Sequence, residues 1–268
     1  MGVEINYHNF FSLTLSKAVI LHACPYGRYG SPWTNKKQRG GRENMFYETE
    51  KNNHGLDFNP FKSLVIPRPI GWLSTLSPEG VVNLAPYSQF IMLNFDPPCV
   101  MISSGAHPDN NRLKDTVRNI EQTGEFVFNM ATYDLREAVN ISSTFVGPEV
   151  DEMEIAGLTA APSKLVKPPR VAESPVHFEC KWLNTMTLPG YKPETNASLV
   201  MGQVIAIHID DDYLTPEGRV DVLKIRPLAR LGYYDYTSVE SVFEMAPLDK
   251  GEMAARRRKG LVGEAIAR

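Results

Sequence analysis

From Leu64 onward the chain consists of short apolar runs separated by turn residues, and this spacing constrains the fold more than any other feature of the sequence. The run SLVIPRPIGWLST ends at the turn SPEG and VV follows, which is typical of a hairpin. QFIMLNF stops at DPP before CVMISS begins, which predicts a second antiparallel return. The longer runs VHFECKWLNTMTL and SLVMGQVIAIHID are each long enough to cross a barrel. The pattern therefore predicts a mainly β barrel or sandwich.

Helical periodicity is confined to two segments. RLKDTVRNIEQTG places Leu113, Val117 and Ile120 on one face and ends in a glycine suited to a helix C-cap. YDLREAVNISS offers Leu135 and Val139 in the same way, with Ile141 matching the pattern less well. We therefore expect a few short helices at the periphery of the β domain.

The chain divides into three parts by composition. Residues 1–44, of which the segment 25–43 has no apolar period, are expected to form a poorly ordered extension, and we hypothesise that Met45 is the native initiator. Residues 45–248 form the predicted β domain, and residues 249–268 form a basic tail that contains RRRK. Within the domain, the proline-rich stretch 148–175 is expected to be an arm wrapped over the surface or over a partner subunit.

The charge balance and cysteine content exclude several classes of function. A net charge of -3 provides no basic field for nucleic acid or an anionic membrane, and no apolar run is long enough to span a bilayer. Three cysteines without a C-x-x-C pair indicate neither a disulfide framework nor a zinc site, and the cytoplasm is the expected location. The six histidines form no H-x-x-x-H pair, so we expect no metal site.

Basic residues stand at the start of the first predicted helix. Arg112, Lys114 and Thr116 occupy the segment that enters its first turn, where cations oppose the helix dipole, and Asp115 supplies the acid normally found there. Lys114, the Thr116 hydroxyl and the free backbone amides of the first turn would together bind a phosphate. The alternative is that Arg112 and Lys114 simply point into solvent.

The segment NLAPYSQF is unusual for a strand because it contains a proline and several polar residues. Pro86 has no N–H to donate to a ladder, so we expect it to interrupt the pairing locally and to free the backbone groups of Ala85, Tyr87 and Ser88. A flat heteroaromatic ring needs such backbone groups at its polar rim and small or proline-shaped surfaces against its face. If Ser103 and Ser104 face the phosphate, this segment lies within reach of the same ligand.

Eight segments carry a resemblance to a known family. NPFKSLVIPRPIGWLST, NLAPYSQF, DPPCVMISSG, KDTVRNI, TGEFVFNMATYDL, ECKWLN, LVMGQVIAIHIDD and RPLARLGYYDY occur in this order between about His54 and Met245. Together they resemble the flavin reductase-like, FMN-binding split-barrel family, in the branch that includes flavoredoxin. The resemblance implies a six-stranded Greek-key split β-barrel, a homodimer, and FMN held without a covalent link near the subunit interface.

The resemblance also implies roles for particular residues. The FMN phosphate would be held by Ser74 or Thr75, by Ser103 or Ser104, and by Lys114 and Thr116. From the residues themselves, independently of the resemblance, we also expect Asp115 to position Lys114. The ring and ribityl chain would meet the residues of the NLAPYS segment, namely Asn83, Ala85, Pro86, Tyr87 and Ser88. Tyr233 and Tyr234, in RLGYYDY, would close one side of the pocket.

The implied chemistry belongs to the flavin, with NADH or NADPH as donor and free flavin, a metal ion or a partner monooxygenase as acceptor. Short reductases of the wider family often carry an Asp-His pair just before the G-x-V strand, whereas this chain has NASLVMGQV. An NAD(P)H-dependent flavin reductase-like enzyme and an FMN electron carrier without a nicotinamide site therefore both stay open, together with a barrel that has lost its flavin.

Overall fold

The structure is a computed structural model that describes residues 44–106 and 113–258. Apart from Asn44, the predicted N-terminal extension lies outside these ranges, as do Arg112 and residues 259–268 of the predicted basic tail. The described residues from Met45 onward belong to one compact unit.

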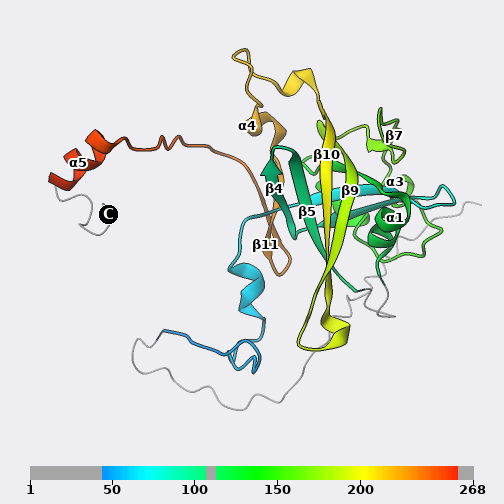
Figure 1. The fold of residues 1–268 in the computed structure, drawn as a ribbon, viewed down its shortest axis with the longest axis horizontal. Coiled ribbons are helices and arrows are strands. Elements are labelled where there is room, and N and C mark those ends of the chain that lie inside the picture. Colours follow the sequence, from blue (N-terminus) through cyan, green and yellow to red (C-terminus); the bar gives the residue numbers. More distant parts are fainter. Residues whose placement is uncertain (1–43, 107–112, 259–268) are drawn as a thin grey trace, which may run out of the picture. The chain divides into compact units, whose positions relative to one another are not determined.

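The largest sheet has seven antiparallel strands in the order β3-β2-β6-β9-β10-β5-β4. Figure 1 shows the long strands β9 and β10 side by side, with β5 and β4 beyond them. The seven strands are β2 (Gly71–Leu76), β3 (Val82–Tyr87), β4 (Phe90–Phe95), β5 (Pro98–Gly105), β6 (Glu125–Met130), β9 (Val176–Leu188) and β10 (Ala197–Ile209). The two hairpins and the two long strands predicted from the sequence are confirmed.

This sheet curls around a single core. Residues from all seven strands share that core, and the rings of Phe90 on β4 and Phe128 on β6 stack with their centroids 4.9 Å apart. Three strands separate β4 from β6 in the sheet, so this contact requires the sheet to bend back on itself. The mainly β split-barrel prediction is confirmed, with seven strands in the sheet where the resemblance implies six.

The remaining elements are short. A second sheet joins β1 (Arg68–Pro69), β11 (Leu228–Gly232) and β12 (Asp235–Ser238), while β7 (Ala160–Ala161) pairs with β8 (Arg170–Val171). The α-helices are α1 (Asp115–Thr123), α2 (Arg136–Ile141), α3 (Glu152–Ile155), α4 (Val222–Ile225) and α5 (Lys250–Arg258). Single 3₁₀ turns occur at η1 (Pro60–Ser63), η2 (Pro193–Thr195) and η3 (Asp211–Tyr213).

Helix α1 forms where the sequence predicts it and packs into the barrel. Val117 and Ile120 are buried in the barrel core, whereas Leu113 precedes the helix and is exposed. Gly124 adopts φ +74° at the C-cap, and its amide donates to the Ile120 carbonyl over 2.8 Å. Lys114 is the N-cap residue and has extended backbone angles. The first turn of α1 therefore begins directly after Lys114.

A second apolar cluster lies on the other face of β2 and β3. It joins Trp72 and Leu84 of these strands to Val139 of α2 and Met153 of α3. The indole Nε1 of Trp72 donates to Ser142 Oγ over 2.9 Å in a buried site. This contact fixes the end of α2 against β2.

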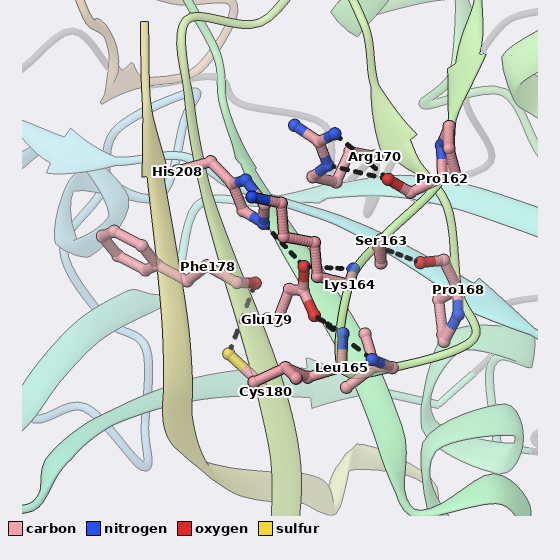
Figure 2. Close-up of polar contacts among 11 residues, drawn as sticks. Pro162, Ser163, Lys164, Leu165, Pro168, Arg170, Phe178, Glu179, Cys180 and His208 are labelled. Carbon is pink, nitrogen blue, oxygen red and sulfur yellow. Dashed lines mark hydrogen bonds and ion pairs between the residues drawn. The ribbon is translucent and has the colours of Figure 1, made fainter.

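The proline-rich arm of residues 148–175 wraps over the chain's own sheet. Glu179 of β9 is fully buried, and its carboxylate accepts from the amides of Lys164 (2.8 Å), Leu165 (2.6 Å) and Val166 (3.2 Å) (Figure 2). His208 Nε2 approaches the same carboxylate to 2.6 Å. Of the two surfaces that the sequence left open for this arm, the structure therefore shows contact with its own sheet.

These contacts set the protonation state of Glu179. Burial alone would raise the pKa of its carboxyl, but hydrogen bonds from the Lys164 amide, His208 and the Leu165 amide outweigh burial and lower the pKa below its usual range. The group is therefore an ionised anchor for the arm at neutral pH.

Two further surveys apply only to residues 44–106 and 113–258. Within them, no helix combines the length and apolar character needed to cross a bilayer. No group of three or more His, Cys, Asp or Glu side chains in the same ranges is placed to hold a metal ion.

Candidate functional site

A pocket forms where the N-terminus of α1 meets the edge strand β3. Its volume is about 80 Å³, and its walls come from four segments of the chain. They are Asn83 and Ala85–Tyr87 of β3, Lys114–Thr116 of α1, the loop 142–146 and Glu152 of α3. The structure thus brings together seven of the predicted site residues: Asn83, Ala85, Pro86, Tyr87, Lys114, Asp115 and Thr116.

Lys114 supplies a positive charge that is largely removed from water. Its ammonium lies over the rings of Tyr87 (5.6 Å) and Phe145 (5.4 Å). Burial lowers the pKa of the ammonium below its ordinary value. Among the described residues no carboxylate forms an ion pair with Lys114, and the amides of the first helical turn have no intrahelical partners. This combination attracts an anion.

Asn83 and Thr116 connect the strand to the helix. Asn83 Nδ2 donates to Thr116 Oγ1 over 2.9 Å, and both residues are buried. The Thr116 hydroxyl accepts this bond, so its own proton remains available to a ligand. The carbonyl oxygen of the Asn83 amide is a second polar atom beside the pocket.

Tyr87 places a hydroxyl in the same region. The ring is buried, and within the described part of the chain its hydroxyl has no partner with hydrogen-bond geometry. Burial raises the pKa of the phenol to about 12, although the hydroxyls of Thr116 and Ser104 act against that rise. A buried hydroxyl without a partner costs free energy, which a ligand or a water molecule at this position would recover.

Two acids face the pocket. Asp115 is paired with Arg118, whose Nη2 lies 2.5 Å from the carboxylate, so its charge is offset. Glu152 is 7% exposed, and its Oε2 accepts from the Leu84 amide over 2.9 Å. Burial raises the pKa of the Glu152 carboxyl to about 7, with further increases from Asp115 and Asp151. The sequence analysis missed Glu152 because no motif links an acid in the arm to β3.

Ser74 and Thr75 are not among the residues that line this pocket, and their hydroxyls have other partners. Both are fully buried. Ser74 Oγ donates to the Pro169 carbonyl over 2.5 Å and accepts from Asn129 Nδ2 over 3.1 Å. Thr75 Oγ1 accepts from Asn119 Nδ2 over 3.2 Å. Their hydroxyls thus hold the arm and α1 in place.

Ser88, Ser103 and Ser104 are close to the pocket in the fold but are not among its lining residues. Ser88 is half-buried in the link from β3 to β4. The Ser103 amide donates to the Gln89 carbonyl over 2.9 Å, and the buried Ser104 hydroxyl donates to the Gly105 carbonyl over 3.2 Å. Their part in ligand binding stays a prediction.

Tyr233 and Tyr234 lie in the turn between β11 and β12, outside the pocket at α1. The Tyr233 ring packs edge-on against Phe58 with centroids 5.5 Å apart, and Tyr234 is almost fully exposed. A contact between Tyr233 and a ligand therefore also stays a prediction.

Pro86 does not interrupt the ladder, so that prediction is wrong. The pairing of β3 with β2 is continuous, with Pro86 opposite Trp72. Strand β3 is at the edge of the sheet, and the Leu84 amide points away from β2 to Glu152. Pro86 follows two residues later and therefore has its nitrogen on the same outward side, where no ladder hydrogen bond is lost.

A larger pocket of about 480 Å³ lies between α2 and the β11–β12 hairpin. Its walls include Tyr133, Tyr236 and the exposed Tyr234, with Val139 and Leu228 among its apolar residues. The guanidinium of Arg136 stacks on the Tyr133 ring at 4.2 Å. None of the predicted phosphate-binding residues lines this second pocket.

Comparison with known proteins agrees with the fold. An uncharacterized protein of Aquifex aeolicus is 44% identical over 173 residues, which cover 64% of this chain and 85% of that protein. The structure resembles nitrilotriacetate monooxygenase component B from Bacillus cereus (TM-score 0.70, 26% identity, 76% of this chain and 100% of that one). It also shares the fold of flavoredoxin from Desulfovibrio vulgaris (TM-score 0.59, 19% identity, 70% and 95%).

A family model covers most of the part of the chain that carries the three sheets and the α1 pocket. The model, described as "Flavin reductase like domain", matches residues 63–237, a range that includes β2, β3 and α1. The match spans more than half of the sequence and agrees with the split barrel seen in the structure. This chain therefore belongs to the flavin reductase-like family.

Proposed function

We propose that the chain is an FMN-dependent oxidoreductase whose FMN phosphate binds at the first turn of α1. The observation that carries this proposal is the meeting of Lys114 and Thr116 with Asn83 and Tyr87 in one pocket. Asn83 and Thr116 are 33 positions apart in the sequence, yet they share a buried hydrogen bond. Membership of the flavin reductase-like family supports a flavin as the ligand.

The residues present fit the phosphate end of FMN. The ammonium of Lys114 and the first-turn amides of α1 offer charge and donors, and the hydroxyls of Thr116 and Tyr87 offer two more donors. Because Arg118 offsets Asp115, the nearest acid on the helix does not cancel Lys114. The site is therefore suited to one phosphate monoester.

The tricyclic ring needs more room than this pocket provides. Pockets for ligands of this size usually measure about 300–1,000 Å³, whereas the pocket at α1 measures about 80 Å³. We propose that the ribityl chain and ring extend along Ala85, Pro86 and Ser88, with Ser103, Ser104 and Tyr233 as further contacts. Another surface must then cover the ring.

A second copy of the chain is the proposed cover. Strand β4 forms an open edge of the sheet and exposes Ile91, Met92, Leu93 and Phe95. Single chains rarely leave such an apolar edge in water, because it pairs readily with another strand or surface. We propose a homodimer with FMN near the interface, which sedimentation equilibrium would test. A mass of one chain at micromolar concentration would contradict it.

Bound FMN would supply hydride and electron transfer, and the protein would bind and orient it. We propose NADH or NADPH as donor, and free flavin or a partner monooxygenase as acceptor. The likeness to a monooxygenase component B at 26% identity supports the last of these. The chain's own contribution is the phosphate site, the shape of the β3 edge and the exclusion of water around Lys114.

A second candidate function is an FMN electron carrier that another protein reduces. The sequence NASLVMGQV, whose last eight residues form the first part of β10, lacks the Asp-His pair through which short reductases often receive the nicotinamide. This specific departure from the wider family favours the carrier.

One experiment separates these functions. The purified protein is saturated with FMN, its absorption is recorded without oxygen, and NADH or NADPH is then added. Rapid bleaching supports the reductase, and bleaching by dithionite alone supports the carrier. A protein that binds no FMN would rule out both.

Lys114→Ala tests the placement of the phosphate. Loss of a charge-assisted contact is expected to cost about 1.5–3 kcal/mol of binding free energy, which is roughly a 10- to 150-fold higher Kd for FMN. Fluorescence titration measures this, and Lys192→Ala, an exposed lysine outside the pocket, is the control. Equal FMN affinity in both variants would remove Lys114 from the site.

A further inference from the structure

Glu152 occupies an unusual position for an acid beside a phosphate site. It is the first residue of α3, it is 7% exposed, and its side chain lines the pocket. Among the ion pairs of residues 44–106 and 113–258, none includes Glu152. Its charge is thus not offset in the way that Arg118 offsets Asp115.

The position of the Glu152 carboxyl is fixed by the strand that carries the ligand contacts. Oε2 accepts from the Leu84 amide over 2.9 Å, and Leu84 stands between Asn83 and Ala85 on β3. The carboxyl therefore cannot move out of the pocket without breaking a hydrogen bond to the edge of the sheet. An anion in the pocket must lie near this group.

The groups around Glu152 favour its neutral form. Asp115 faces it from α1 and Asp151 from its own N-cap, and both add to the effect of burial. The nearby phenol of Tyr87 is neutral at ordinary pH. The loop 142–146 adds the uncharged Ser142, Ser143 and Thr144, and among the described residues that line the pocket the cation is Lys114. At neutral pH the carboxyl consequently exchanges between its neutral and ionised forms.

We propose that Glu152 determines the selectivity of the site for FMN over riboflavin. When the Glu152 carboxyl is protonated, the phosphate can bind beside it, and when the carboxyl is ionised, it repels the phosphate. This inference rests on the proposed function, because it assumes that a flavin phosphate occupies the pocket. Neutral Glu152 leaves Lys114 as the dominant charge for the phosphate. Ionised Glu152 places a negative charge beside the dianion and weakens FMN, whereas riboflavin has no phosphate to be repelled.

Linkage gives the size and direction of the effect. If the complex requires a proton on a group with a pKa of about 7, FMN binding takes up a proton and weakens as the pH rises above 7. Between pH 7 and pH 8.5 the Kd of FMN is expected to rise roughly 15-fold. Over this range the phosphate itself is already mostly a dianion, since its second pKa is about 6.

The test compares FMN and riboflavin binding at pH 7 and pH 8.5 by fluorescence titration. Wild type should lose FMN affinity roughly 15-fold and keep its riboflavin affinity. Glu152→Gln keeps an oxygen for the Leu84 amide, and its FMN affinity should be independent of pH over this range. Glu154→Gln, an exposed acid on the same helix, should behave like wild type. A pH-dependent Kd that persists in Glu152→Gln would assign the proton to Lys114 and overturn the proposal.

Calorimetry of wild type and Glu152→Gln at pH 8, in two buffers of different ionisation enthalpy, measures proton uptake directly. Net uptake by wild type that is lost in Glu152→Gln supports the proposal. FMN binding without uptake, or uptake that persists in Glu152→Gln, overturns it while leaving the proposed function intact. Wild type that binds no FMN in either assay would overturn both.

Discussion

Glu179→Gln is expected to release the arm of residues 148–175 from the sheet. In the native protein one fully buried carboxylate accepts from three consecutive amides, those of Lys164, Leu165 and Val166, and from His208 (Figure 2). Glutamine has almost the same volume but only one acceptor oxygen. Its NH₂ group would face donors that now have no acceptor.

The magnitude follows from counting these bonds. The single oxygen of glutamine can accept two of the four, so at least two hydrogen bonds to a charged group are lost. At about 1.5–3 kcal/mol for each such bond, the free energy of unfolding should fall by roughly 3–6 kcal/mol. Domains are usually stable by only about 5–15 kcal/mol, so this variant should fold but unfold at much lower urea concentrations.

Urea denaturation at pH 7.5, followed by circular dichroism, measures the loss. Glu173→Gln is the matched control, because Glu173 is an exposed acid of the same arm that accepts from one amide, that of Thr159. Hydrogen exchange should show faster exchange at residues 164–166 in Glu179→Gln alone. If both variants lose less than about 1 kcal/mol, the carboxylate does not anchor the arm.

Two further predictions concern stability. Gly202→Ala would place a Cβ against the Phe126 ring, closer than van der Waals contact allows. This overpacking should lower the free energy of unfolding by about 1–3 kcal/mol. The second substitution Phe126→Leu should restore most of the lost Tm, and a Tm that stays low in the double variant would refute this clash. Burial lowers the pKa of His177 to about 4 in the folded protein, whereas its pKa in the unfolded chain is about 6.5. Between these two pH values the unfolded chain binds more protons, so the free energy of unfolding falls as the pH falls from about 6.5 to about 4. Discounted for partial solvation, the expected loss in the free energy of unfolding from pH 7 to 5 is about 1–2 kcal/mol. It is measured in the Glu152→Gln background, because the raised pKa of Glu152 changes stability in the opposite direction over this range. A free energy of unfolding that does not change with pH would contradict this linkage.

Much of the fold could be predicted from local patterns. The runs that end at SPEG and DPP became the β2–β3 and β4–β5 hairpins, and Gly124 ends α1 as expected. These features depend on residues a few positions apart, whose turn and capping preferences act within one segment. The first-turn position of Thr116 and its closeness to Asn83 also agree with the predicted site.

Other features depend on which segments meet, and the sequence gives no local signal for them. Glu152 reaches the Leu84 amide across 68 positions, and Ser74 donates to the Pro169 carbonyl of the arm across 95 positions. Pro86 fits because β3 is an edge strand, which is a property of the whole sheet.

The sequence by itself therefore determined the elements, their antiparallel returns and the chemical character of the α1 turn. Only the tertiary structure decided which buried polar groups are paired, as with Glu179, and which remain available to a ligand, as with Lys114 and the Tyr87 hydroxyl. The physical reason is range: turns, caps and alternation act over a few residues, whereas burial and pairing depend on the path of the entire chain.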